Sequence, residues 1–208
     1  MVKPLQLAPG VTLWREYFPR HAQQELLDDV LSRIAEAPLY RPVMPKSGKA
    51  FSVEETNFGS LGWISDVAGY RYAAVHPRTG KAWPTIPVPL TDLWSAIAGY
   101  VQPAECCLVN LYRSGAKMGL HQDRDEAATD APVVSISLGD DALFRFGGTA
   151  RKGPTQSVTL SSGDVLRFGG AARLMFHGID RVVPESSRLI AGGGRFNLTM
   201  RRVSRPRE

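Results

Sequence analysis

The stretch that decides the fold is LVNLYRSGAKMGLHQDRD, residues 108–125. Its two halves predict two strands, joined by a turn at Ser114-Gly115-Ala116-Lys117. Residues two apart on a strand share one face, so Asn110 and Tyr112 are expected to point the same way. The polar residues of this hairpin therefore gather on one side of a sheet.

The second half of the hairpin carries a candidate metal site. On a strand, His121 and Asp123 share a face, and their imidazole and carboxylate groups can take neighbouring positions around one metal ion. His177 is the expected third ligand of a facial triad, which leaves positions open for chemistry. An exposed turn would give the same His-x-Asp pattern. The interpretation as a metal site therefore needs support from a second set of polar residues.

That second group lies near the C-terminus, in an alternating strand predicted at residues 195–203. Its polar residues fall on one face: Arg195, Asn197, Thr199 and Arg201. Two buried arginines need anions, and their Cα atoms lie roughly 20 Å apart at about 3.3 Å per residue. A small dicarboxylate could satisfy both guanidinium groups. A solvated edge strand is the alternative interpretation.

The second half of the chain is predicted to be mainly β. From Cys106 onward, short alternating segments recur at 106–112, 117–123, 133–138, 142–146, 155–160, 164–168, 174–179 and 195–203. Glycine, aspartate and serine turns separate them. Eight short strands predict a jelly roll, or double-stranded β-helix, that closes around a small-ligand cavity. We expect this catalytic core at residues 106–203.

The first half, residues 11–105, is expected to flank that core. Val11 to Phe18 reads as a strand, and the next segment reads as a helix with the apolar stripe Leu26, Leu27, Val30, Leu31 and Ile34. Residues 51–57 read as a strand. A second helix is expected near Thr91, with the apolar positions Leu93, Trp94, Ile97 and Val101.

Composition limits the class of protein. The chain has 208 residues, a formal net charge of +5 and a pI near 9.4, which suits one globular domain over residues 1–208 and a polyanionic partner. Residues 1–10 lack the apolar run of a signal peptide or membrane span, so we expect a soluble, cytoplasmic protein. We also expect it to be a monomer. The adjacent Cys106 and Cys107 point to opposite faces of a strand and are expected to be reduced.

Three aromatic residues give the nucleic-acid hypothesis its content. Trp63, Tyr70 and Tyr72 lie near arginines and turn residues, and bases stack on aromatic faces with about 1 to 3 kcal/mol each. Packing under a long loop is the alternative for any one of them. The two other histidines, His21 and His76, are expected at the surface.

Taken together, these motifs resemble the AlkB family of Fe(II)- and 2-oxoglutarate-dependent dioxygenases. The resemblance covers roughly residues 11–203 and rests on features in a fixed order, namely Thr56-Asn57, Leu61-Gly62-Trp63, Gly69-Tyr70 with Tyr72, Trp83-Pro84, Asn110-x-Tyr112, His121-x-Asp123, His177 and Arg195-x5-Arg201. It implies Fe(II) as cofactor, with 2-oxoglutarate and O₂ as cosubstrates. The implied reaction hydroxylates an N-linked methyl group and releases formaldehyde, succinate and CO₂.

The resemblance also implies roles for individual residues. Arg195 and Tyr112 would hold the distal carboxylate of 2-oxoglutarate. Asn110 and Arg201 would lie nearer the iron, with Asn197 in support.

The segment with Trp63 and Tyr70 resembles a substrate lid in this family, and Arg151 resembles a position that touches substrate. Asp125 is expected to place a carboxylate beside a cationic base, unless it pairs with a surface arginine. Glu55 departs from the family pattern, because an apolar pocket residue is expected there. This departure puts in doubt which bases the lid accepts.

The favoured function is dealkylation of 1-methyladenine and 3-methylcytosine in single-stranded or flipped-out DNA, with RNA as a further substrate. The same chemistry on a protein or small molecule is the first alternative, and it predicts no aromatic lid. A jelly-roll module that binds metal without oxidation is the second, and it leaves the paired arginines unexplained.

Overall fold

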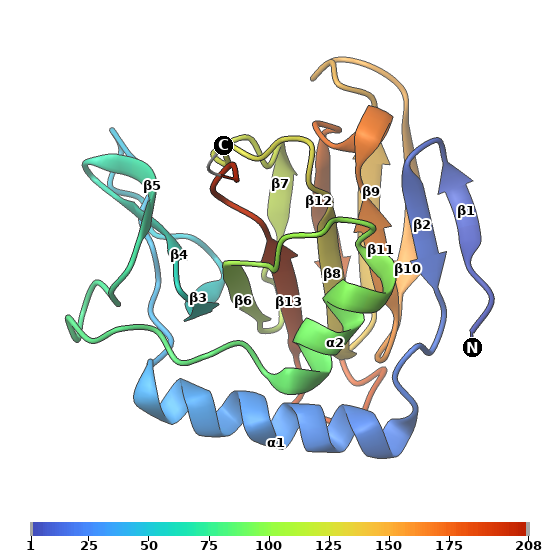
Figure 1. The fold of residues 1–208 in the computed structure, drawn as a ribbon. Helices are drawn as coiled ribbons and strands as arrows, with labels where there is room; N and C mark the ends of the chain where they lie inside the picture. The colour runs from blue at the N-terminus through green and yellow to red at the C-terminus, as the bar shows by residue number, and fades with distance from the viewer. Residues whose placement is uncertain (1, 207–208) are drawn as a thin grey trace.

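The computed structural model describes residues 2–206 (Figure 1). Met1, Arg207 and Glu208, which belong to the expected domain 1–208, lie outside the described residues. Two sheets face each other across the core. One has seven strands in the order β1-β2-β11-β8-β13-β6-β3, and the other has four in the order β10-β9-β12-β7.

All eight strands expected after residue 105 are present, and their bounds are β6 Cys106–Tyr112, β7 Met118–His121, β8 Val133–Gly139, β9 Ala142–Gly147, β10 Thr155–Leu160, β11 Val165–Phe168, β12 His177–Val182 and β13 Arg195–Arg201. Four of them form the centre of the large sheet and the other four form the whole small sheet. This pairing of two four-stranded layers confirms the predicted jelly roll.

Several expected strands have bounds that differ from the prediction by a few residues, and β13 ends at Arg201 rather than residue 203. β12 spans His177–Val182 rather than residues 174–179, and a short 3₁₀ turn at residues 170–172 precedes it. β7 ends at His121, so Asp123 and Asp125 lie on the segment that follows rather than on the strand itself.

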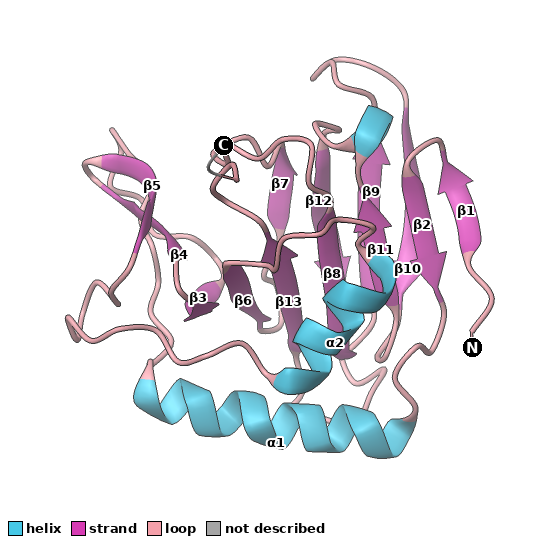
Figure 2. Cartoon of the chain, in the orientation of Figure 1, coloured by secondary structure: helices cyan, strands magenta, loops and turns pink. Residues whose placement is uncertain are grey.

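The first half of the chain extends and covers the large sheet. β1 Leu5–Ala8, β2 Val11–Trp14 and β3 Glu54–Gly59 add to its two edges. The helices α1 Arg20–Glu36 and α2 Val88–Ile97 lie against it (Figures 1 and 2). Cys106 and Cys107 are buried and free, as expected.

Both helices form because one face is apolar, and the structure corrects two predicted members of those faces. Leu26, Leu27 and Val30 of α1 are buried, whereas Leu31 is 47% exposed. In α2 the helix ends at Ile97, so Val101 lies beyond it and is 95% exposed.

A separate antiparallel ribbon carries the expected lid. It consists of β4 Gly62–Asp66 and β5 Gly69–Ala73, and it stands beside the β3 edge of the large sheet (Figure 1). The ribbon packs closely against Trp83, and this contact depends on Gly62, since a Cβ there would lie 2.4 Å from the Trp83 ring.

His76 corrects another expectation. It is 1% exposed rather than on the surface. Its Nε2 contacts the Pro38 carbonyl at 2.8 Å, and its Nδ1 accepts hydrogen bonds from the backbone of Arg78 and Thr79. His76 therefore holds the loop after β5. Across residues 2–206, the helices are too short or too polar to cross a membrane.

Candidate active site

The two histidines of the site meet because their strands are neighbours in the small sheet. His121 and His177 are direct cross-strand partners on β7 and β12, and their ring centroids lie 4.5 Å apart. Gly178 permits this approach, since a Cβ there would lie 2.5 Å from the Met118 carbonyl oxygen. The sheet register alone therefore brings together two ligands that are 56 positions apart in the chain.

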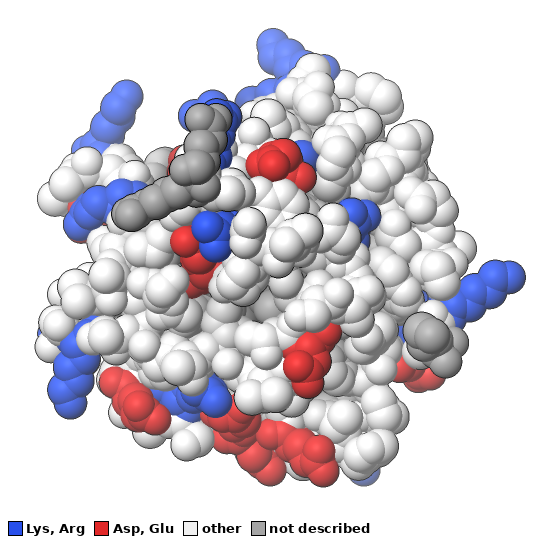
Figure 3. Space-filling model, viewed as in Figure 1, with Lys and Arg blue, Asp and Glu red and all other residues white. Residues whose placement is uncertain are grey.

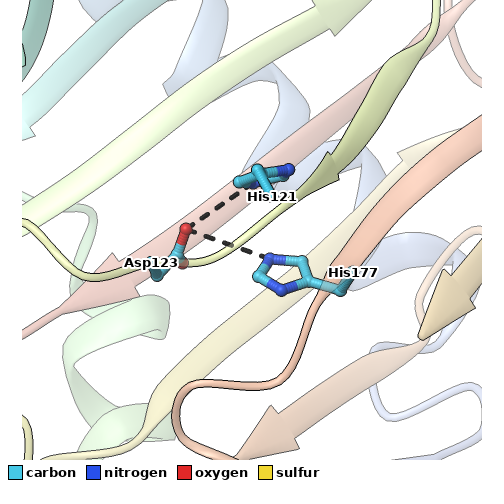
Figure 4. Close-up of side chains that lie close together, drawn as sticks. All are labelled: His121, Asp123 and His177. Carbon is cyan, nitrogen blue, oxygen red and sulfur yellow. Dashed lines mark ion pairs between the residues drawn. The ribbon is translucent and has the colours of Figure 1, made fainter. Parts of the chain in front are cut away.

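Asp123 completes the group from the segment after β7 (Figure 4). Its Oδ1 lies 3.6 Å from His121 Nε2 and 3.9 Å from His177 Nε2. The other oxygen, Oδ2, accepts a hydrogen bond from Arg201 Nε at 2.9 Å and forms an ion pair with Arg201 Nη2 at 2.8 Å. Arg201 thus fixes one carboxylate oxygen while the second faces the histidines.

The donor set suits a divalent metal ion. The potential ligand atoms of His121, Asp123 and His177 all lie within 4.8 Å of one another. Each histidine places Nδ1 against a backbone carbonyl, Gly119 at 2.9 Å and Met175 at 3.1 Å, which leaves Nε2 free to bind metal. Two imidazoles and one carboxylate form the facial triad typical of non-haem Fe(II) oxygenases.

The protonation states favour the same ion. Burial, with the nearby His121, lowers the pKa of His177 to about 4, so its imidazole is neutral and can donate a lone pair. Burial raises the pKa of the Asp123 carboxyl, but the charges of Arg201 and the two histidines and the hydrogen bond from Arg201 together outweigh burial and hold the pKa well below its usual range. At neutral pH the site therefore offers the neutral imidazole of His177 and the anionic carboxylate of Asp123.

Arg195 lies deeper in the same cavity with much of its guanidinium unpaired. The residue is 1% exposed, and its Nη2 donates to Ser137 Oγ at 2.9 Å, while Nε and Nη1 have no hydrogen-bond partner among the described residues. Its Cζ lies 5.5 Å over the Tyr112 ring. Burial lowers its pKa to about 10. A buried cation with two free donors calls for an anionic ligand.

For the second arginine, Arg201, the structure corrects the prediction that it needs an anionic ligand. Arg201 already has its anion, since it binds Asp123 and lies 3.6 Å from Glu126. The case for a dicarboxylate therefore rests on Arg195 alone.

The other residues predicted to face the cosubstrate lie where the alternating pattern put them. Asn110, Tyr112 and Asn197 all line the cavity of about 610 Å³ that contains the triad. Asn197 is held within the sheet, where its Nδ2 donates to Ser135 Oγ at 2.6 Å.

An aromatic wall closes the other side of the cavity. Trp63 and Tyr70 stack with ring centroids 5.4 Å apart and planes 20° from parallel. Trp63 Nε1 donates to Asp125 Oδ2 at 2.9 Å, so these three predicted substrate residues form one unit. Arg151 also lines the cavity, with its Cζ 5.7 Å over the Phe176 ring. Tyr72 is not among the lining residues, because its hydroxyl donates to Glu126.

Sequence reasoning missed the buried network that supports the metal ligands. Arg173 donates to the Asp123 carbonyl at 2.6 Å and to Glu126 Oε2 at 3.0 Å. Glu126 also accepts from Tyr72 of the ribbon, so this network links the lid to the segment that carries Asp123. The only available signal was the position of Glu126 beside Asp125, which predicts nothing about its burial.

Comparison with known proteins decides the family. The family model described as the 2OG-Fe(II) oxygenase superfamily matches residues 10–201. A Caulobacter vibrioides protein named alpha-ketoglutarate-dependent dioxygenase AlkB homolog is 53% identical over 205 residues, covering 98% of this chain and 92% of that protein. The chain belongs to the AlkB family of these oxygenases.

Further relatives agree with this membership. The Escherichia coli alpha-ketoglutarate-dependent dioxygenase AlkB is 39% identical over 204 residues and is covered to 93%. The solved structure of OsALKBH1 superposes with a TM-score of 0.80 at 30% identity and covers 96% of this chain and 99% of that one. This AlkB-family member is an Fe(II)-dependent dioxygenase that uses 2-oxoglutarate and O₂.

Proposed function

We propose that this dioxygenase removes alkyl groups from N-alkylated nucleobases of the 1-methyladenine and 3-methylcytosine type in DNA, and so repairs DNA by direct reversal. One observation carries the proposal: the stacked rings of Trp63 and Tyr70 line the same cavity as the His-Asp-His group. A flat base can stack on this wall with its alkyl group toward the triad. A general hydroxylase of proteins or small molecules has no need of such a wall.

In this proposal His121, Asp123 and His177 hold Fe(II). The bound iron supplies the oxidation of 2-oxoglutarate and of the alkyl carbon by O₂. Arg201 fixes the orientation of the Asp123 carboxylate through a hydrogen bond and an ion pair, and Arg173 donates a hydrogen bond to its backbone carbonyl. The chain thereby sets the geometry of the ligands before any cofactor binds.

The remaining polar residues of the cavity position 2-oxoglutarate. Arg195 binds its distal carboxylate through the two free donors, beside Tyr112. Asn110 and Arg201 lie nearer the metal end, and Asn197 supports the sheet beneath them. A guanidinium with two free N–H groups binds a carboxylate in the bidentate manner that a lysine cannot.

The substrate residues hold the base and its strand. Trp63 and Tyr70 stack on the base, Asp125 holds Trp63 and lies beside the base, and Arg151 contacts the nucleic-acid backbone at the cavity mouth. Tyr72 supports the lid through Glu126. Basic side chains also project near the β4–β5 ribbon, whereas acidic ones gather along the lower edge over α1 (Figure 3).

The cavity accepts a single base, which suits single-stranded DNA or a base flipped from a duplex, and RNA offers the same bases. A methyl group on N1 of adenine or N3 of cytosine lies on the pairing edge, so such a lesion flips at lower cost. A monomer in the cytoplasm remains our prediction for the protein as a whole.

Mass spectrometry of a single-stranded oligonucleotide with one 3-methylcytosine tests the proposal. The parent protein with Fe(II), 2-oxoglutarate and O₂ should convert the lesion to cytosine, and Asp123→Ala should leave it intact. Asp92→Ala, on the exposed side of α2, is the control. A folded, iron-loaded parent that leaves 3-methylcytosine and 1-methyladenine unchanged would refute the proposal.

A further inference from the structure

Glu55 is a buried carboxyl group on the floor of the cavity. It lies on β3, is 1% exposed and lines the cavity. Its backbone N–H and C=O both bond to Tyr40, at 2.7 and 3.0 Å, on the side away from β6. Its antiparallel pairing with Asn110 on β6 is therefore of the non-hydrogen-bonded kind, in which side chains lie closest. Glu55 and Asn110 are thus adjacent on one face.

Both side chains carry an oxygen that needs a donor. Glu55 Oε2 and Asn110 Oδ1 are buried and have no hydrogen-bond partner among residues 2–206. Burial raises the pKa of Glu55 to about 8, and the nearest opposing influence is the positive charge of Arg201. Buried polar oxygens without a hydrogen-bond donor destabilise the folded chain, so such a pair favours a ligand that supplies donors. Two adjacent acceptors are suited to a ligand with N–H groups.

Glu55 also lies on the side of the cavity where the base is proposed to bind. Asn57, two residues along the same face of β3, clamps the backbone of Trp63 with two hydrogen bonds, Nδ2 to the carbonyl at 2.9 Å and Oδ1 from the N–H at 3.0 Å. Residues two apart on a strand are separated by about 6.6 Å. Glu55 therefore shares a strand face with the residue that anchors Trp63, and both Glu55 and Trp63 line the cavity.

We propose that Glu55 determines base specificity by accepting a hydrogen bond from the exocyclic amino group of the alkylated base. This inference rests on the proposed function and deepens it. The amino group of 3-methylcytosine or 1-methyladenine supplies N–H donors to Glu55, with Asn110 Oδ1 as the neighbouring acceptor. The alkylated ring is cationic, and a nearby positive charge favours the ionised carboxylate.

An oxo base is disfavoured at the same position. The bases 3-methyluracil and 3-methylthymine carry a carbonyl where 3-methylcytosine carries its amino group, so the ionised carboxylate of Glu55 would face an acceptor. A site that is built to bond one polar group discriminates strongly against an analogue that leaves its buried groups unpaired. Hydrogen bonds to charged groups contribute about 1.5 to 3 kcal/mol, or roughly tenfold to a hundredfold in affinity.

The test compares 3-methylcytosine with 3-methyluracil, which differ in one ring substituent, amino or oxo, and therefore in charge. Each is placed in the same fluorescent single-stranded oligonucleotide, and anisotropy gives its Kd with 2-oxoglutarate and Mn(II) in the absence of O₂. The parent should prefer 3-methylcytosine by at least about tenfold. Glu55→Met removes both oxygens and should remove most of the preference, and Glu55→Gln should reduce it and strengthen 3-methyluracil binding, because an amide can also donate.

Glu54→Gln is the matched control. Glu54 is the neighbouring residue on β3 but points to the other face, where it lies 4.0 Å from Arg41. It should keep the parent's preference. Thermal melting checks that each variant is folded, and the 2-oxoglutarate affinity should be unchanged in all of them.

The possible failures are distinguishable. If the parent binds neither lesion better than the unmodified oligonucleotide, the proposed function is contradicted and the inference falls with it. If the parent shows no preference for 3-methylcytosine, or if Glu55→Met retains the parent's ratio, the role of Glu55 is overturned while the proposed function stands.

Discussion

Arg195 is the residue whose environment most clearly requires a ligand. It is almost fully buried, and two of its three guanidinium nitrogens lack partners among the described residues. Arg195→Lys keeps a positive charge but loses the planar pair of donors. We expect the apparent affinity for 2-oxoglutarate to fall by at least about tenfold, or roughly 1.4 kcal/mol, with metal affinity unchanged.

Succinate formation as a function of 2-oxoglutarate concentration measures this loss, and Arg188→Lys on the exposed loop before β13 is the control. A variant that titrates like the parent would remove Arg195 from the cosubstrate site.

Glu55 gives a prediction for stability against pH. The folded chain holds this proton up to about pH 8, while the unfolded chain releases it near pH 4.5. Between these values the folded state binds more protons, so Glu55 lowers the free energy of unfolding as pH rises. Relative to Glu55→Met, the parent should therefore lose stability between about pH 5 and 8, on the order of a few kcal/mol.

Urea titrations of the two proteins at several pH values measure this difference, and groups common to both cancel. A stability difference that does not change with pH would show that Glu55 has an ordinary pKa.

At the residue scale, the sequence predicts most of the site because alternation on a strand is reliable. That rule correctly places four residues on the cavity wall, namely Asn110, Tyr112, Arg195 and Asn197. It could not show that Arg201 is neutralised by Asp123, because that pairing joins residues 78 positions apart.

At the scale of elements, the β4–β5 ribbon is the part that proved hardest to predict. Its five-residue strands contain two glycines, and only β5 alternates, so no strand pattern was evident. Its position depends instead on a tertiary clamp, the two hydrogen bonds between Asn57 and the Trp63 backbone.

Asn57→Ala tests whether that clamp places the lid. Removing the amide leaves the Trp63 N–H and carbonyl without partners, at a cost of about 1 to 3 kcal/mol each. We expect KM for a 3-methylcytosine oligonucleotide to rise about tenfold, while succinate formation without a base substrate stays at the parent level.

Ser60→Ala, in the turn between β3 and β4, is the control for this variant. Its hydroxyl makes only a 3.5 Å exposed contact with Glu105. An equal fall in both activities of Asn57→Ala would mean that Asn57 supports the whole site rather than the lid.

At the scale of the whole molecule, the metal should couple to stability. A ligand that binds only the folded state stabilises it by mass action, by about 2.7 kcal/mol at a hundred times its Kd. Mn(II) should therefore raise the Tm of the metal-free parent, and a chelator should reverse the change. Asp123→Asn should lose most of this shift, whereas Asp92→Asn should keep it. A Tm that Mn(II) leaves unchanged in the parent would argue against a metal site at His121, Asp123 and His177.

The overall architecture was predictable because eight short strands with regular turns permit few folds. The way in which the two sheets bring the ligands together was not, since the cross-strand contact of His121 with His177 depends on a register that local sequence does not encode.

The most direct test of the account is formaldehyde release from a 3-methylcytosine oligonucleotide, measured with and without 2-oxoglutarate in the presence of Fe(II) and O₂. The account predicts one formaldehyde for each repaired base, accompanied by succinate, and none when 2-oxoglutarate is omitted or His177 is replaced by alanine. Formaldehyde release that does not depend on 2-oxoglutarate, or succinate formation that methylated DNA leaves unchanged with no formaldehyde produced, would contradict it.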